Sequence, residues 1–176
     1  MTLPLVLFAL AFVPMALEAR RSRSNDRRLR AQGAREPEGD VYPAMQVAYP
    51  ACFLAMVIEA WLRGRTFNGV FVAGALVFAA AKGLKYWAIA TLGPRWTFRV
   101  LVPPGSTLVA SGPYRHMRHP NYVGVAGEML GMALMSQAPI AGAAATIGFA
   151  ALLLARIRVE ERALGALSAR NSRPGV

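Results

Sequence analysis

The chain has 176 residues, of which 55% are hydrophobic, with a mean hydropathy of +0.36 and a formal net charge of +11. This length accommodates one domain, and the composition suits a lipid bilayer better than water. Small basic proteins often bind nucleic acid, so the placement of the charge must separate that class from membrane proteins.

Five discrete apolar stretches divide the chain. About 20 helical residues cross a hydrocarbon core about 30 Å thick. The second, third and fifth stretches are long enough, the first is slightly short, and the fourth would reach only partway or lie inside the bundle. The sequence therefore predicts an all-α integral membrane protein with about five transmembrane helices in a single domain, residues 1–176. The expected helices cover about residues 3–18, 44–62, 69–92, 122–136 and 138–158.

The basic residues lie on alternate sides of these stretches. Seven arginines follow the first stretch, four follow the third and five lie at or beyond the end of the fifth, whereas the opposite side has only Arg63 and Arg65. Cytoplasmic loops carry an excess of Lys and Arg. We therefore expect the N-terminus outside, the C-terminus in the cytoplasm, and no nucleic-acid partner.

Two polar connections stand out. Residues 20–43 are Arg-rich and predict a cytoplasmic loop that begins as a helix on the membrane surface. Its acidic residues Glu36, Glu38 and Asp40 are expected to fold back onto these arginines. Residues 93–121 are rich in Pro and Gly and predict an irregular loop. So long a loop is usually functional or disordered, and its aromatic and basic side chains favour function.

The later apolar stretches contain small and ionisable residues. Gly127 and Gly131 form a GxxxG pair, which predicts close helix packing. Glu128 is too short to reach the membrane surface, so we expect it to pair with Lys82 or Lys85. The alternative is that both lysines extend to the membrane surface.

Two clusters have the chemistry of a site. Residues 112–122, with both histidines of the chain, end at an expected helix N-terminus, which favours an anion. Residues 156–162 contain Glu160 and Glu161, which point about 100° apart on a helix. The alternatives are an interfacial cap for the first cluster and a solvated face of Glu–Arg pairs for the second. No metal site is expected.

The residues of these clusters resemble a known family. The run Gly-Pro-Tyr-Arg at 112–115, then Arg-His-Pro-Asn-Tyr at 118–122 with Gly124, is followed after a helical hairpin by Arg-x-Glu-Glu at 158–161. This pattern is similar to the isoprenylcysteine carboxyl methyltransferase family, whose core phospholipid methyltransferases share. Residues 92–105 resemble its bacterial branch, and the similarity is strongest over residues 92–164.

The resemblance implies S-adenosylmethionine as the cofactor, bound on the cytoplasmic side between the last helices and their loops. The residues that would bind it are Tyr114, Arg118, His119, Pro120, Asn121, Tyr122, Gly124, Glu160 and Glu161. Trp96 and Arg99 would orient the substrate, and Arg99, His116 and Glu160 are the catalytic candidates.

The resemblance also implies a methyl acceptor of lipid-like or isoprenoid character, modified on a phenol, enol or carboxylate oxygen. One subgroup of the family methylates lipid-tailed phenols or pyrones, and the compact chain resembles that subgroup. Val41 and Tyr49 replace histidines that are common in the bacterial branch, which leaves the acceptor open. The Arg- and Ala-rich composition indicates a bacterial source of high GC content, so we expect the protein in a bacterial inner membrane with its active site facing the cytoplasm. The alternatives are an NADPH-dependent enzyme of the sterol-reductase type and a non-catalytic lipid-binding subunit.

Overall fold

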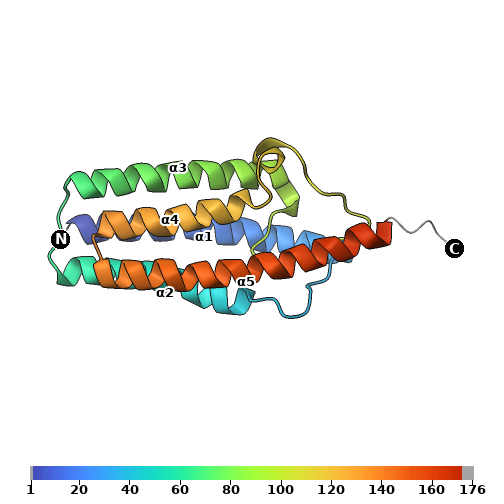
Figure 1. Ribbon diagram of the computed structural model, residues 1–176, viewed down its shortest axis with the longest axis horizontal. Coiled ribbons are helices and arrows are strands. Elements are labelled where there is room, and N and C mark those ends of the chain that lie inside the picture. Colours follow the sequence, from blue (N-terminus) through green and yellow to red (C-terminus); the bar gives the residue numbers. More distant parts are fainter. Residues whose placement is uncertain (1, 172–176) are drawn as a thin grey trace.

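A computed structural model of the protein describes residues 2–171 and consists of helices and connecting loops. Helices α1, α3 and α5 run in one direction along the bundle, and α2 and α4 run in the other (Figure 1). Two short 3-10 turns, η1 and η2, interrupt the long loop between α3 and α4. The elements are α1 Thr2–Ala31, α2 Tyr42–Leu62, α3 Gly69–Leu92, η1 Gly93–Arg95, η2 Gly112–Arg115, α4 Pro120–Ser136 and α5 Pro139–Asn171.

Two helices are longer than the sequence predicts. Helix α1 continues to Ala31 instead of ending near residue 18, so much of the expected loop at 20–43 is helical. Arginine is a good helix former, and the chain has no Gly or Pro between Pro14 and Gly33. Helix α5 likewise continues to Asn171. The apolar pattern therefore marks the parts of these helices that are suited to a membrane, and their polar continuations extend past it.

Four helices among the described residues are long and apolar enough to cross a membrane: α1, α2, α3 with η1, and the first part of α5. Helix α4, with 17 residues, is not among them, in agreement with the short fourth stretch. It lies within the bundle, alongside α3 and α5 (Figure 1). Buried residues such as Met129, Met132 and Met135 line its length.

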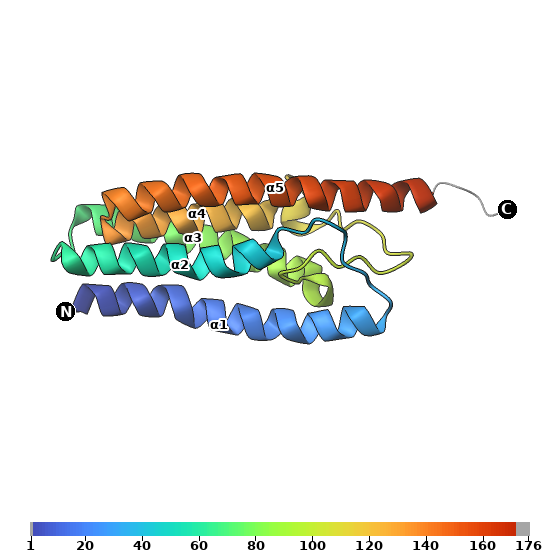
Figure 2. The same cartoon turned by 90° about the horizontal axis from the view of Figure 1, so that it is seen from below.

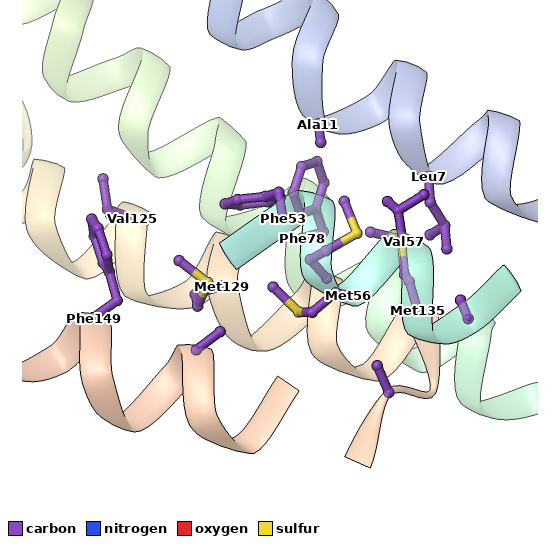
Figure 3. Packing of buried hydrophobic residues seen from close by; sticks show 14 of the residues in the cluster. Leu7, Ala11, Phe53, Met56, Val57, Phe78, Val125, Met129, Met135 and Phe149 are labelled. Carbon is purple, nitrogen blue, oxygen red and sulfur yellow. The ribbon is translucent and has the colours of Figure 1, made fainter. Parts of the chain in front are cut away.

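The core of the bundle is aromatic and rich in methionine. Phe53 and Met56 of α2 meet Met129 and Met135 of α4, with Leu7 of α1 at one side (Figure 3). Figure 3 also shows how closely α3 and α4 approach each other. A Cβ added at Gly131 would lie 2.6 Å from the backbone nitrogen of Phe78 in α3. The expected role of the small residues in close packing is therefore confirmed.

A cluster of charges lies inside the bundle. Lys85 contacts Glu128 at 3.3 Å, and Lys82 contacts the same carboxylate at 3.2 Å. The expected pairing of Glu128 is thus confirmed, whereas the alternative of lysines extending to the surface is wrong. Glu18 of α1, which the sequence analysis did not assign, contacts Lys82 at 2.9 Å and Lys85 at 2.6 Å. Tyr49 of α2 donates a hydrogen bond to Glu128, so the cluster joins four helices.

The two polar connections meet at one end of the bundle. Figure 2 shows the linker 32–41 and the long loop 93–119 side by side between α1 and the distal half of α5. A backbone bridge joins Arg35 to Val102, and Gly33 lies against the ring of Pro104. This end of the bundle therefore collects all the segments that carry the site residues predicted from the sequence.

Candidate active site

A cavity of about 570 Å³ lies at this end, between the long loop, the start of α4 and the distal half of α5. This volume falls within the range of small-molecule sites, about 300–1,000 Å³. Most of the predicted site residues line it. They are Trp96, Arg99, Tyr114, Arg118, His119, Asn121, Tyr122, Glu160 and Glu161.

Three predicted residues lie elsewhere. The side chain of His116 is exposed and does not line the cavity. Pro120 is buried at the first turn of α4, where its fixed backbone angle suits the start of a helix. Gly124 lies against Lys85 of α3, where a Cβ would be 2.8 Å from the lysine Cβ. In the structure, Pro120 therefore starts α4 and Gly124 packs α4 against α3, and neither lines the cavity.

The first turn of α4 meets the pair of glutamates in α5. The Tyr122 hydroxyl donates a hydrogen bond to Glu160 Oε2, and His119 Nε2 lies 3.3 Å from Glu161 Oε1. The His119 and Tyr122 rings stack with their centroids 5.6 Å apart. The two predicted motifs therefore contact each other, and each glutamate contacts a different ring, as their angular separation on the helix predicts.

Arg156 joins this pair to the rest of the site, and the sequence analysis did not single it out. Its buried guanidinium forms an ion pair with Asp40 and donates to the Phe98 carbonyl at 2.6 Å. Its Nε donates to the Tyr122 hydroxyl at 3.3 Å. An arginine at the end of an apolar helix has the pattern of a cytoplasmic flank. The sequence feature that could have identified Arg156 is its position four residues, about one helical turn, before Glu160.

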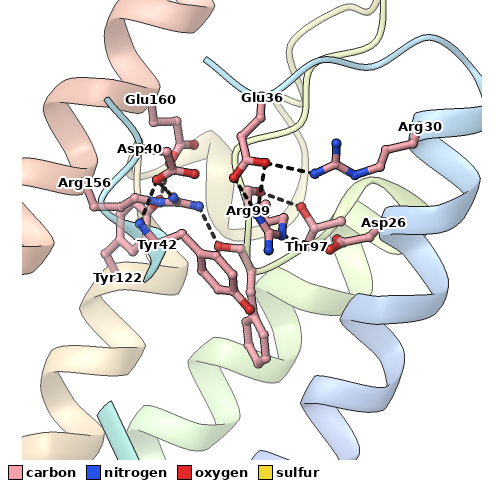
Figure 4. A network of polar contacts seen from close by, with 11 residues as sticks. Asp26, Arg30, Glu36, Asp40, Tyr42, Thr97, Arg99, Tyr122, Arg156 and Glu160 are labelled. Atoms are coloured by element: carbon pink, nitrogen blue, oxygen red, sulfur yellow. Dashed lines mark hydrogen bonds and ion pairs between the residues drawn. The ribbon is translucent and has the colours of Figure 1, made fainter. Parts of the chain in front are cut away.

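The predicted substrate residue Arg99 is already held by carboxylates. Its Nη1 donates to both oxygens of Glu36, at 2.8 and 2.9 Å, and its Nε lies 3.6 Å from Asp26 (Figure 4). The guanidinium also lies over the Tyr42 ring, 4.5 Å from its centroid. Glu36 contacts Arg30 at 2.9 Å as well, so the expected return onto the preceding arginines is confirmed for Glu36. It is wrong for Asp40, which pairs with Arg156 of α5, and Glu38 is exposed. Figure 4 shows these contacts beside those of Arg156.

Two aromatic residues complete the cavity. Trp96 is buried, and its indole nitrogen donates to Asn121 at 3.4 Å, which ties the long loop to α4. Burial raises the pKa of the Tyr114 phenol, and the charge of Glu160 raises it further. Tyr114 is therefore neutral at physiological pH and presents a hydroxyl to the cavity.

A family profile and bacterial relatives match this chain. The profile of the Isoprenylcysteine carboxyl methyltransferase (ICMT) family matches residues 72–166, which include the cavity loop, α4 and both glutamates. An "Uncharacterized protein YpbQ" of Bacillus subtilis (strain 168) is 35% identical over 159 residues, 90% of this chain and 95% of the relative. An "Uncharacterized protein" of Haemophilus influenzae is 25% identical over 162 residues, 92% of each chain. No solved structure matches. The chain belongs to the isoprenylcysteine carboxyl methyltransferase family.

Proposed function

We propose that the protein transfers a methyl group from S-adenosylmethionine to an oxygen of a lipid-like or isoprenoid acceptor at the membrane. Membership of the family indicates a membrane methyltransferase. The observation that supports the choice of donor is the pairing of His119 and Tyr122 with Glu161 and Glu160 on one cavity wall. We assign the catalytic core to residues 92–164 of a single domain.

The side chains of the cavity suit this donor. S-adenosylmethionine has a sulfonium cation, an amino group, ribose hydroxyls and a carboxylate. Glu160 and Glu161 offer carboxylates to the cation and the hydrogen-bond donors, while Arg95 and Arg118 offer guanidinium groups to the carboxylate. When bound, the donor supplies an electrophilic methyl group for in-line displacement, a reaction that depends mostly on positioning.

Hydrogen bonds fix the direction in which the site residues donate. Arg156 can only donate, so the Tyr122 hydroxyl accepts from it and gives its own proton to Glu160. The second oxygen of Glu160 remains for a ligand. Arg99 is paired with Glu36 on the other wall, so its role is to shape and hold the acceptor side of the cavity. His116 is exposed, which leaves Glu160 as the catalytic candidate that both lines the cavity and carries an ionisable oxygen.

The cavity lies at the end of a bundle of apolar helices, and this supports an acceptor with an apolar tail. Such a molecule reaches the site through the bilayer, with its reactive oxygen at the level of the polar loop. The arginine distribution supports an active site that faces the cytoplasm of a bacterial inner membrane.

Titration calorimetry of the purified protein with S-adenosylmethionine, and separately with NADPH, tests the proposal. We expect the methyl donor to bind and NADPH not to bind. Glu161→Gln and Tyr122→Phe should each weaken donor binding about tenfold, because each removes a polar contact of the site worth about 1–2 kcal/mol. Glu38→Gln, a change of the same chemistry at an exposed linker residue, should have no effect.

Radiolabelled methyl transfer then tests the acceptor. Alkyl-tailed phenols, pyrones and carboxylic acids should accept the label, and the same head groups without tails should accept much less. Binding of NADPH but not of S-adenosylmethionine would contradict the proposed methyltransferase and favour a reductase. Equal labelling of tailed and tail-less acceptors would refute entry through the membrane.

A further inference from the structure

The part of α1 beyond its apolar stretch has two different faces. Successive residues of a helix are rotated by about 100°, and by this geometry five buried or half-buried residues lie on one face about 100° wide. They are Glu18, Ser22, Asn25, Asp26 and Leu29. The opposite face is about 160° wide by the same geometry. All of its charged residues are exposed arginines. They are Arg20, Arg21, Arg23, Arg27 and Arg28.

The inner face holds the loop that lines the cavity. Ser22 Oγ accepts a hydrogen bond from the Phe98 backbone N–H at 2.9 Å. Asn25 donates to the Trp96 carbonyl at 2.7 Å and to the Gly93 carbonyl at 3.3 Å. Asp26 lies 3.6 Å from Arg99. These polar contacts, from a little more than one helical turn, fix residues 93–99 against α1.

The outer arginines have no such partners. None of the five forms an ion pair with another side chain between residues 2 and 171, although Arg30, a few residues on, pairs with Glu36. An uncompensated cluster of five positive charges on one helix face attracts anions strongly, especially where the neighbouring medium has a low dielectric constant.

Their position identifies the anion. Arg20 follows Leu17, the last residue of the apolar stretch, by three positions. At about 1.5 Å per residue, Arg20 lies about 4.5 Å beyond the end of the apolar stretch, and Arg20 to Arg28 extend over about 12 Å. The headgroup region occupies that zone, and arginine side chains can reach back toward it. Guanidinium groups bind phosphate oxygens in a bidentate manner.

We propose that the outer arginine face of α1 binds anionic phospholipid headgroups, and that this contact, through the inner face, fixes the cavity loop 93–99. The surface therefore makes the order of the active-site loop depend on the lipids around the protein. The lipid contact stands independently of the chemistry in the cavity, whereas its effect on donor affinity rests on the proposed function.

The test uses the full-length protein in lipid nanodiscs of phosphatidylcholine with or without phosphatidylglycerol. Three forms are compared: the wild type, a variant with all five arginines changed to Gln, and one with all five changed to Lys. Native mass spectrometry counts the phosphatidylglycerol molecules that stay bound. Hydrogen exchange reports the order of residues 93–99, and calorimetry reports affinity for S-adenosylmethionine.

We expect the wild type to retain phosphatidylglycerol over phosphatidylcholine by about tenfold, as expected for several basic residues near a membrane. The Lys variant should keep this preference, because the charge is preserved, and the Gln variant should lose it. Phosphatidylglycerol should slow exchange in the 93–99 loop severalfold in the wild type and not in the Gln variant. Arg158→Gln with Arg162→Gln, a change of two exposed arginines on α5, should leave both readouts unchanged.

Retention of phosphatidylglycerol by the Gln variant at the wild-type level would overturn the lipid site. Arginine-dependent binding of an RNA oligonucleotide without lipid preference would assign the face to nucleic acid instead. Normal lipid retention with unchanged exchange would overturn the coupling to the loop. If the variant with five Gln substitutions does not fold, Arg27→Gln with Arg28→Gln should give a partial loss of phosphatidylglycerol retention. Failure to bind S-adenosylmethionine in every bilayer contradicts the proposed function only.

Discussion

Arg156 is the residue on which the geometry of the site depends most. Its guanidinium and the Asp40 carboxylate have side chains that are 3% and 4% exposed, so both charges are removed from water. A buried pair of this kind is destabilised far more by the loss of one partner than by the loss of both. The same arginine also orients the Tyr122 hydroxyl toward Glu160.

We therefore expect Arg156→Met to lower the free energy of unfolding by about 3–5 kcal/mol, because it strands the Asp40 carboxylate. Asp40→Asn in the same chain should restore part of this loss. Thermal unfolding in detergent, arranged as a double-mutant cycle, measures the coupling. Additive effects of the two changes would show that the pair does not act as a unit.

At the residue scale, the sequence predicts the side chains of local motifs and the pairing of Glu128, and it misses Arg156 and Glu18. His119, Tyr122, Glu160 and Glu161 stand in two short motifs, and they meet as the helical period requires. Arg156 was missed because its partner Asp40 is 116 positions away and its local pattern is that of a helix flank. Glu18 was missed for the same reason, since no feature near it specifies the two lysines.

At the scale of elements, the charged cluster joins the helices. Both lysines of α3 lie between Glu18 of α1 and Glu128 of α4, so two carboxylates and two ammonium groups balance inside the bundle. Balanced and hydrogen-bonded charges are tolerated at such depth, whereas a single unpaired charge is costly.

We expect Lys85→Met and Glu128→Gln each to destabilise the protein by about 3 kcal/mol or more, and the double variant to lose clearly less than the sum. Unfolding midpoints in detergent are measured for the wild type, the two single variants and the double variant. The control cycle uses the more exposed pair Arg63 and Glu59, with Arg63→Met and Glu59→Gln. Its coupling should be about 0.5 kcal/mol or less. Strict additivity at Lys85 and Glu128 would refute the proposed role of the cluster.

The limits of the elements show what a hydropathy pattern measures. The apolar stretches predict the bounds of α2 and α3 closely, because turns with Gly or Asn end these helices where the apolar residues end. They fail for α1 and α5, whose polar continuations remain helical through arginine, alanine and glutamate. Hydropathy identifies the part of a helix that is suited to the membrane. Helix propensity and capping residues determine the full length of the helix.

At the scale of the whole molecule, the alternating direction of the helices determines where the site lies relative to the membrane. The helix ends that meet the long loop lie at one end of the bundle, and the turn 63–68 lies at the other (Figure 1). Under the proposed orientation, which places the arginine-rich end in the cytoplasm, the cavity would face the cytoplasm as well.

Cysteine labelling in intact cells checks this orientation. In a Cys52→Ser background, Phe67→Cys should react with a membrane-impermeant maleimide, because Phe67 is exposed at the turn end. His116→Cys, exposed at the cavity end, should react only after the cells are made permeable. Labelling of position 116 from outside would reverse the orientation and exclude a cytoplasmic methyl donor.

The ion pair between Asp40 and Arg156 has a consequence for biosynthesis. A chain is made and inserted from its N-terminus, so Asp40 and the first four helices are present before Arg156 emerges. Until then, Asp40, Tyr122 and the Phe98 carbonyl lack the guanidinium that brings them together. The last helix thus closes the site at the final step of assembly, and a chain cut short before it lacks one wall of the cavity and leaves the Asp40 carboxylate without its ion-pair partner.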